Sequence, residues 1–600
     1  MIDYLDIVII VLYLIVTIGI GFWVSKQASK NLSSYFLGGK TLPWYLLGVS
    51  NASGQFDIAG TMWMVSICFV YGLKSVWLPW IWPVFNQVFL MIYLSIWLRR
   101  SNVLTGAEWI NTRFGYGRGA NLAHISVVVF ALITVVMMIA YAFKGIGKFS
   151  QIMLPWGWHE NTYALIILSL TSLYVIKGGM ISVVLTEVLQ FLIMTVASIA
   201  VGIVAMVKIA PETVAQLVPE GWMSPFFGWR MDLDWSGILE SVNASMEKDG
   251  FSLFTVYVML MLLKGVMASL AGPTPGYDMQ RILATRSARE ASLMSGLVCA
   301  VLYVPRYMLV AGLTILALVH FMPQLQQMGQ PDFEQLLPHV IQEQLIPVGL
   351  SGLLLAGLFA AFMSTFAATM NAGPAYIVND IYKRFIRPDA SDRQQVRMSY
   401  LSSLVVVVVG IGLGFFVDRI ADIMMWIFGA LYGGYVASNV LRWHWWRFNG
   451  YGYFWGMMAG IAGTAAVLWV MQIHFSGTNV LYGFPAIFVL SLIGCIAGCL
   501  LTRPEDDEVL TAFYRNVKPW GFWGPIKQKV LAESPEFVPN RDFGRDMFNV
   551  AVGMAWQTSL VTLPIYLVLR QAQGFWISLA VVIVTSVILK FNWFDKLPRD

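Results

Sequence analysis

The chain has 600 residues, of which 58% are hydrophobic and only 12% are charged. Soluble domains carry about 25% charged residues, so this composition excludes an ordinary soluble protein and favours one that lies in a membrane. The net charge of +5 comes mostly from connecting loops and indicates no nucleic-acid partner.

Apolar stretches recur along the whole chain, and each is long enough to cross the hydrocarbon core of a bilayer. The first has no basic start and no cleavage site, so we interpret it as a retained, peripheral helix rather than a signal peptide. Counted from helix 0, the roughly fifteen predicted spans are 4–25, 43–71, 75–98, 120–147, 160–177, 180–208, 251–272, 290–319, 346–383, 395–417, 420–441, 451–473, 480–502, 546–569 and 573–592.

We interpret residues 1–600 as a single transmembrane domain. Its last third comprises helices 11 and 12 at 451–502, a loop at 503–545, and two additional helices at 546–592. Most Lys and Arg residues fall in the loops after even-numbered helices, whereas the loop at 320–345 has none. Basic loops stay in the cytoplasm. This pattern predicts a multi-pass protein of the cell (inner or plasma) membrane, with the N-terminus outside and with the C-terminus and the 503–545 loop in the cytoplasm.

An unusual segment, GVSNASGQFDIAG at 48–60, lies inside the apolar span 43–71. Backbone groups in hydrocarbon must be satisfied, so an interrupted helix persists only where it lines a cavity or binds a ligand. We predict that the helix is interrupted over residues 50–54. Its polar side chains and free carbonyls are then available to a ligand.

A second Gly/Pro segment, GPTPG at 272–276, follows the span 251–272. Two interpretations are open: the segment interrupts helix 6 inside the membrane, or it marks where that helix leaves the membrane. Paired interruptions are typical of transporters built from inverted repeats, whose site lies near the middle of the membrane. The spacing fits repeats of five helices at 43–208 and 251–441, and Thr274 is then a candidate solute ligand.

The segment AAFMSTFAATMN at 360–371 places two adjacent hydroxyls, Ser364 and Thr365, among small residues. Alone this is a weak signal, because Ser and Thr in membrane helices usually bond to their own backbone. Beside an interrupted helix, however, the hydroxyls and free carbonyls supply about five neutral oxygens. That set suits a monovalent cation such as sodium and disfavours a divalent one.

Several segments in this order resemble the sodium/solute symporters, the family of the sodium/glucose, sodium/proline and sodium/sialic acid symporters. They are LGGKTLPWYLLGVSNASG at 37–54, GGMISVVLTEVLQ at 178–190, YDMQRILATRSAREA at 277–291, AAFMSTFAATMN at 360–371 and NDIYKRF at 379–385. The resemblance implies an all-helical fold of the leucine-transporter type. Two inverted repeats (helices 1–5 and 6–10), with helix 1 and helix 6 discontinuous, are then joined by about five extra helices.

The resemblance also implies specific ligands. The sodium site is expected to consist of the carbonyls of Val49, Ala52 and Ala361 and the hydroxyls of Ser364 and Thr365. The side chains of Asn51, Ser53 and Gln55 are then expected to face the solute cavity.

Two departures from the family pattern bear on sodium stoichiometry. Members that carry a second sodium have further hydroxyls one turn along helix 8, where this chain has Ala367 and Ala368, and an aspartate in helix 5, where it has Glu187. We therefore predict one sodium per transport cycle. Glu187 is expected near the hydroxyls of helix 8, where it lowers the cost of a nearby cation, takes up a proton, or pairs with a neighbouring donor.

Three ionisable residues, Asp57, Lys264 and Arg306, lie within predicted spans. A charge at the centre of a membrane helix costs about 2.5–3.5 kcal/mol, so each is a candidate functional residue. Arg306 is suited to bind a solute carboxylate through two parallel hydrogen bonds. Asp57 is a further candidate solute ligand. Alternatively, Arg306 belongs to a structural pair, and Asp57 and Lys264 form structural ion pairs with each other or with Glu187.

These observations favour a symporter that imports a small polar solute, such as a sugar, a sugar acid or a related carboxylate, together with sodium. Alternatives are a proton-coupled transporter that uses Glu187 and a transporter-like sensor, although no signalling domain precedes Asp600. No nucleophile or metal motif indicates an enzyme. Expected partners are the solute and membrane lipid, and the expected assembly is a monomer or weak homo-oligomer.

Overall fold

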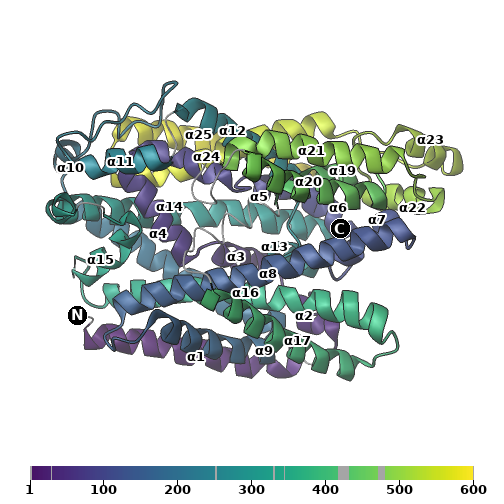
Figure 1. Cartoon of the computed structure of the whole chain (residues 1–600), viewed down its shortest axis with the longest axis horizontal. Coiled ribbons are helices and arrows are strands. Elements are labelled where there is room, and N and C mark those ends of the chain that lie inside the picture. The colour runs from purple at the N-terminus through teal and green to yellow at the C-terminus, as the bar shows by residue number, and fades with distance from the viewer. Residues whose placement is uncertain are drawn as a thin grey trace.

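The computed structural model describes residues 3–28, 30–249, 253–328, 331–343, 345–416, 432–470 and 480–598. Among these residues every regular element is a helix and no strand is present. The long helices run along the long axis of the molecule (Figure 1). Ten of the described helices are long and apolar enough to cross a membrane. The all-helical, polytopic architecture predicted from the sequence is therefore confirmed.

The N-terminal part contains several interrupted spans. The predicted span 75–98 begins as a helix only at residue 86, because a 3-10 segment that contains Pro79 precedes it. The two spans predicted at 160–208 form one element with a break at Gly179, whose φ of 53° favours glycine. The elements are α1 (Tyr4–Ala28), α2 (Leu32–Leu37), α3 (Trp44–Gly54), α4 (Ile58–Tyr71), η2 (Gly72–Ile81), α5 (Asn86–Phe89), η3 (Leu90–Leu94), α6 (Ser95–Arg100), α7 (Gly106–Phe114), α8 (Arg118–Met153) and α9 (Glu160–Lys208).

The middle of the chain repeats the pattern of a broken helix followed by long ones. Its elements are α10 (Pro211–Leu217), α11 (Glu240–Asp249), α12 (Phe254–Leu270), α13 (Tyr277–Ala284), α14 (Ala288–Gln327), α15 (Leu336–Gln342), α16 (Leu350–Ala375), the π-helical η6 (Tyr376–Ile386), α17 (Asp392–Phe416) and α19 (Tyr432–His444). The first part of the helix predicted at 420–441 lies outside the described residues.

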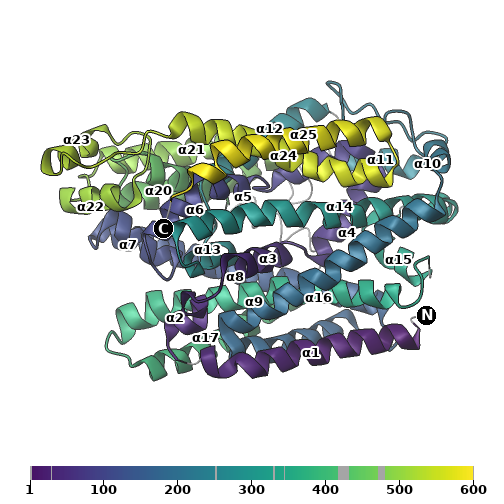
Figure 2. The same ribbon diagram turned by 180° about the vertical axis from the view of Figure 1, so that it is seen from behind.

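The C-terminal part adds α20 (Gly450–Val470), α21 (Val480–Leu500), α22 (Asp507–Val517), α23 (Gly524–Glu533), α24 (Phe543–Val568) and α25 (Ala572–Asn592). Helices α24 and α25 pack against each other, and α24 also packs along α14, as Figure 2 shows. At the opposite edge of the molecule, α1 covers α9 and α16 and exposes a row of large apolar side chains. The short helices α3 and α13 lie in the centre between these two edges (Figures 1 and 2).

The segment between α10 and α11 is anchored to the end of α4. Trp222 and Trp235 are buried, and their indole N–H groups donate to the carbonyls of Phe69 and Val70 at 2.9 and 3.1 Å. These bonds satisfy carbonyls that the end of a helix otherwise leaves without partners. The segment is therefore a packed cap on α4, not a solvated loop.

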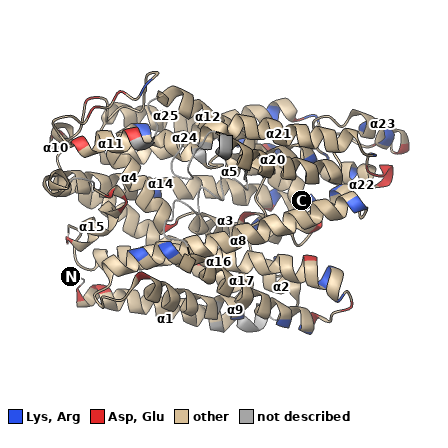
Figure 3. Ribbon diagram, viewed as in Figure 1, with Lys and Arg blue, Asp and Glu red and all other residues tan. Residues whose placement is uncertain are grey.

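Charge is unevenly distributed between the two ends of the helical bundle. Lys and Arg gather at the end that carries α2, α22 and α23, opposite the N-terminus (Figure 3). The two termini lie towards opposite ends of the long axis (Figure 1). Termini at opposite ends of the bundle are the arrangement expected for a chain that crosses the membrane an odd number of times.

Candidate functional site

Helix 1 is interrupted directly after the segment 50–54 in which the sequence predicted the interruption. α3 is helical through Gly54, and only residues 55–57 lie between it and α4. Asp57 ends the interruption, because its carboxylate accepts a hydrogen bond from the Gly60 N–H at 2.6 Å and so caps α4. The prediction of an interruption at 50–54 is therefore wrong. Val49 lies within a helical turn, and the carbonyls of Ala52 and Ser53 in the last turn of α3 accept the backbone N–H groups of Gln55 and Phe56.

Helix 6 is also discontinuous. α12 ends at Leu270, residues 271–276 are not helical, and α13 begins at Tyr277. Gly272 has a φ of 88°, a backbone conformation that glycine adopts without strain. The buried residues of α13 show that the chain continues inside the molecule after the break. Of the two interpretations of GPTPG, an interruption within the bundle is the correct one.

Both interruptions open onto one internal cavity of about 260 Å³. Its wall is completed by residues of α5, α8, α14 and α16. Four predicted solute residues line this cavity: Gln55, Asp57, Thr274 and Arg306. Asn51 and Ser53 are buried but do not line it, because the helix continues through them and the chain turns towards the cavity only afterwards.

The sequence analysis missed Asn86, Gln87 and Asp278, which also line the cavity. Asp278 Oδ1 accepts hydrogen bonds from the side-chain amides of Gln87 at 3.2 Å and Gln55 at 3.4 Å. The adjacent amides at 86–87 were a usable signal, since polar pairs are rare within an apolar span. Their convergence on Asp278 was not visible, because 191 positions separate Gln87 from it.

Arg306 and Asp57 flank Gly60 on the cavity wall. A methyl group added to Gly60 would lie 2.7 Å from Asp57 Oδ2 and 3.3 Å from Arg306 Nη2. Asp57 Oδ1 accepts a second hydrogen bond, from the Tyr141 hydroxyl at 2.9 Å. Arg306 lies over the Phe56 ring at 5.7 Å, and its buried Nε has no hydrogen-bond partner among the described residues.

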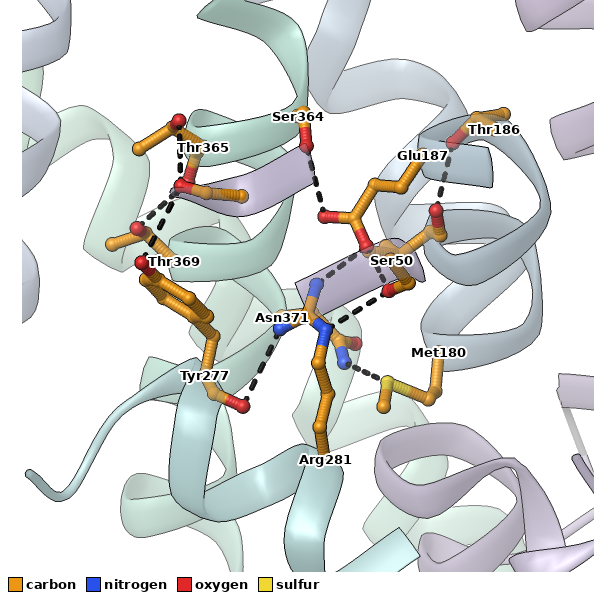
Figure 4. A network of polar contacts seen from close by, with 12 residues as sticks. Ser50, Met180, Thr186, Glu187, Tyr277, Arg281, Ser364, Thr365, Thr369 and Asn371 are labelled. Atoms are coloured by element: carbon orange, nitrogen blue, oxygen red, sulfur yellow. Dashed lines mark hydrogen bonds and ion pairs between the residues drawn. The ribbon is translucent and has the colours of Figure 1, made fainter. Parts of the chain in front are cut away.

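The two hydroxyls of α16 have different partners: Thr365 bonds to the end of α3, whereas Ser364 points towards Glu187 (Figure 4). Thr365 Oγ1 donates to the carbonyl of Gly54 at 3.0 Å and also lies 3.2 Å from the carbonyl of Ala361. The Tyr277 hydroxyl from α13 reaches the same Gly54 carbonyl at 3.3 Å. The last turn of α3, the helix 6 break and α16 therefore meet at one point.

Glu187 joins the other hydroxyl to a buried arginine (Figure 4). Its Oε1 accepts from Ser364 at 3.4 Å, and its Oε2 accepts from Ser50 and from Arg281 Nη2, the latter at 2.5 Å. Arg281 Nε donates to Ser50 Oγ at 2.9 Å. Glu187 and Arg281 are both fully buried. The ion-pair partner of Glu187 is thus Arg281 rather than Lys264 or Asp57.

Apolar helices around a polar cavity, with two helices interrupted where they reach it, define a multi-pass membrane protein of the transporter type. The model of the sodium:solute symporter family matches residues 35–460. The chain belongs to the sodium:solute symporter family.

Curated relatives agree with this assignment. The chain is 26% identical to a sodium/mannose cotransporter from Bos taurus, over 84% of this chain and 88% of that one. It is 24% identical to a sodium/glucose cotransporter from Vibrio parahaemolyticus, over 68% and 74%, and to a sodium/myo-inositol cotransporter from Homo sapiens, over 86% and 76%. Because these relatives are transporters, the chain is a transporter and not an enzyme.

A solved structure of a Na+-coupled sialic acid symporter, in a substrate-bound outward-open state, has the same fold. The TM-score is 0.61 at 17% identity, and the match covers 84% of this chain and 99% of that one. The resemblance to the sodium/solute symporters seen in the sequence is therefore confirmed, together with the all-helical, polytopic fold class.

Proposed function

We propose that the chain is a symporter that couples the inward movement of one sodium ion to the uptake of a small polar solute. The observation that carries the proposal is the hydrogen bond from the Thr365 hydroxyl of α16 to the Gly54 carbonyl at the end of α3, with the Ser364 hydroxyl adjacent on the same helix. A cation between these helices has the hydroxyls of Ser364 and Thr365 on one side and backbone carbonyls on the other. These oxygens are neutral, which favours a monovalent over a divalent ion.

The proposed sodium ligands are the carbonyls of Val49, Ala52 and Ala361 and the hydroxyls of Ser364 and Thr365. Ala52 and Ala361 are buried on α3 and α16, the two helices that Thr365 joins. The carbonyl of Val49 lies within a helical turn, but a carbonyl oxygen has a second lone pair that can face an ion.

A single sodium per cycle follows from the charge on Glu187. This acid already has a positive partner in Arg281, and the next positions along α16, Ala367 and Ala368, offer no hydroxyl. A second cation beside Glu187 has to compete with a buried guanidinium for the same carboxylate. The same ion pair disfavours proton coupling through Glu187, since protonation leaves Arg281 unpaired.

Transport is proposed to follow alternating access between two inverted repeats, 43–208 and 251–441, each of which begins with a broken helix. Sodium binding joins α3 to α16 and favours the state that is open to the outside, with the cavity ordered for solute. The basic end of the bundle is assigned to the cytoplasm, which places the N-terminus outside.

Thermal unfolding against sodium concentration, with potassium holding the ionic strength constant, tests the ion site. A ligand that binds only the folded state raises stability by RT ln(1 + [L]/Kd), so wild type should show a saturable shift. Ser364→Ala should reduce that shift. Ser351→Ala is the matched control on the same helix, because the partners of its hydroxyl among the described residues are the carbonyls of Ile346 and Pro347.

Two results contradict the ion site. A wild-type response to sodium no larger than the response to potassium removes the basis for sodium coupling. An equal loss of response in Ser364→Ala and Ser351→Ala shows that the effect is structural rather than local to the site.

A further inference from the structure

The solute cavity has a single positive charge that the protein itself leaves unpaired. Arg306 is the only Lys or Arg among the described residues that line the cavity. Arg306 is 9% exposed, and among the described residues its buried Nε has no hydrogen-bond partner and its guanidinium has no ion-pair partner. Burying a guanidinium without partners is costly, so this arrangement favours an anionic ligand group.

The two carboxylates on the cavity wall are each committed to donors of the protein. Asp57 Oδ1 accepts from the Gly60 N–H and from the Tyr141 hydroxyl, and the carboxylate also lies at the positive N-terminus of α4. Asp278 Oδ1 accepts from the amides of Gln55 and Gln87. Only one oxygen of each carboxylate is engaged in this way, and Asp57 Oδ2 faces Gly60 beside Arg306 Nη2. Among the described residues, however, neither carboxylate forms an ion pair with Arg306.

At the start of α5, hydrogen-bond acceptors rather than donors lack partners. The side-chain carbonyl oxygens of Asn86 and Gln87 are buried and have no hydrogen-bond donor among the described residues. Both residues line the cavity, and their side chains are 8% and 3% exposed. A buried acceptor that lacks a donor costs about 1–3 kcal/mol, so a ligand with hydroxyl groups is favoured here.

We infer that the transported solute is an acidic sugar or polyol, whose carboxylate binds Arg306 and whose hydroxyls bind Asn86 and Gln87. This inference rests on the proposed function and narrows its solute to one chemical class. A planar guanidinium and a carboxylate can form two parallel hydrogen bonds, which a neutral sugar cannot reproduce.

Matched pairs of acidic and neutral sugars test the inference on the purified full-length chain in saturating sodium. The probes are D-glucuronate against D-glucose and D-galacturonate against D-galactose, read by thermal unfolding. At least one acid should stabilise wild type more than its neutral partner. Arg306→Gln should weaken the apparent affinity for that acid at least about tenfold, and Arg306→Lys should give an intermediate loss.

Arg289→Gln is the control, because Arg289 lies on the same helix and, within the described residues, donates hydrogen bonds to the carbonyls of Leu597 and Pro598 rather than lining the cavity. It should keep the response to the acid. The sodium shift without sugar, measured in the same samples, should persist in Arg306→Gln and reports folding and the ion site separately.

The inference is overturned if neutral sugars stabilise wild type as strongly as their acids, or if Arg306→Gln keeps the acid response. It is also overturned if neither acid shifts a wild-type protein that responds to sodium. In each case the sodium response stands, so the proposed symport is not affected. A missing sodium response, by contrast, contradicts the proposed function itself.

Discussion

Two buried arginines near the broken helices have opposite surroundings. Arg281 on α13 is paired with Glu187 and bonded to Ser50, which joins α3, α9 and α13. Arg306 on α14 faces the cavity with its Nε unpartnered among the described residues. The comparison separates two uses of a buried charge: one that the protein neutralises to hold its helices together, and one that it leaves for a ligand.

The largest expected effect concerns the neutralised arginine. Glu187→Ala leaves Arg281 buried without its ion-pair partner, and removing one member of a buried pair costs about 3–5 kcal/mol. The free energy of unfolding should fall by that amount in denaturant or thermal melts. Glu533→Ala is the control, because Glu533 pairs with Arg515, both side chains are exposed, and such pairs contribute less than about 1 kcal/mol. Equal losses in the two variants contradict the assigned role of Glu187.

A smaller effect on stability is expected at the hydrogen bond between Tyr141 and Asp57 on the cavity wall. Tyr141→Phe removes one of the donors to Asp57 Oδ1, and a hydrogen bond to a charged group contributes about 1.5–3 kcal/mol. Because the cavity admits water to this site, the loss of stability should be nearer about 1 kcal/mol. Chemical denaturation measures it, and a change in the sodium shift of the same variant is not expected. A loss of sodium response would mean that Asp57 acts on the ion site.

The smallest effect on stability is expected at Arg306. Arg306→Gln removes a charge that has no protein partner to lose, so the free energy of unfolding should change by less than about 1 kcal/mol or increase. The measurement is made without solute, beside wild type and Arg289→Gln. A loss of about 3 kcal/mol or more, as for a broken buried pair, contradicts the contrast between the two arginines.

The sequence was sufficient for the helical architecture and for the existence of both breaks, because apolar length and Gly/Pro segments are local signals. It misplaced the first break, since the end of α3 is set by residues distant in the chain: Thr365 and Tyr277 both bond to the carbonyl of Gly54. It proposed a partner for Glu187 without identifying Arg281, 94 positions away. Local sequence patterns predict where the helices lie, whereas contacts between helices distant in the sequence are seen only in the folded structure.

Some of the residues that line the solute cavity were predicted from the sequence, and others became visible only in the fold. Gln55, Asp57, Thr274 and Arg306 were predicted because each is polar in an apolar span or lies at a break. Asn51 is buried on the continuous helix α3 and is not among the residues that line the cavity, because the break falls after it. Asn86, Gln87 and Asp278 were missed, because only the fold places their side chains in the same cavity.

The most direct test of the central claim is equilibrium binding of radioactive sodium to the purified protein. Wild type should bind one sodium per chain in a saturable manner that excess potassium does not abolish. Thr365→Ala should lose that binding, because it removes the hydroxyl that meets the end of α3. Two sodium ions per chain would contradict the role given to the Glu187–Arg281 pair. Undiminished binding in Thr365→Ala would contradict the site itself.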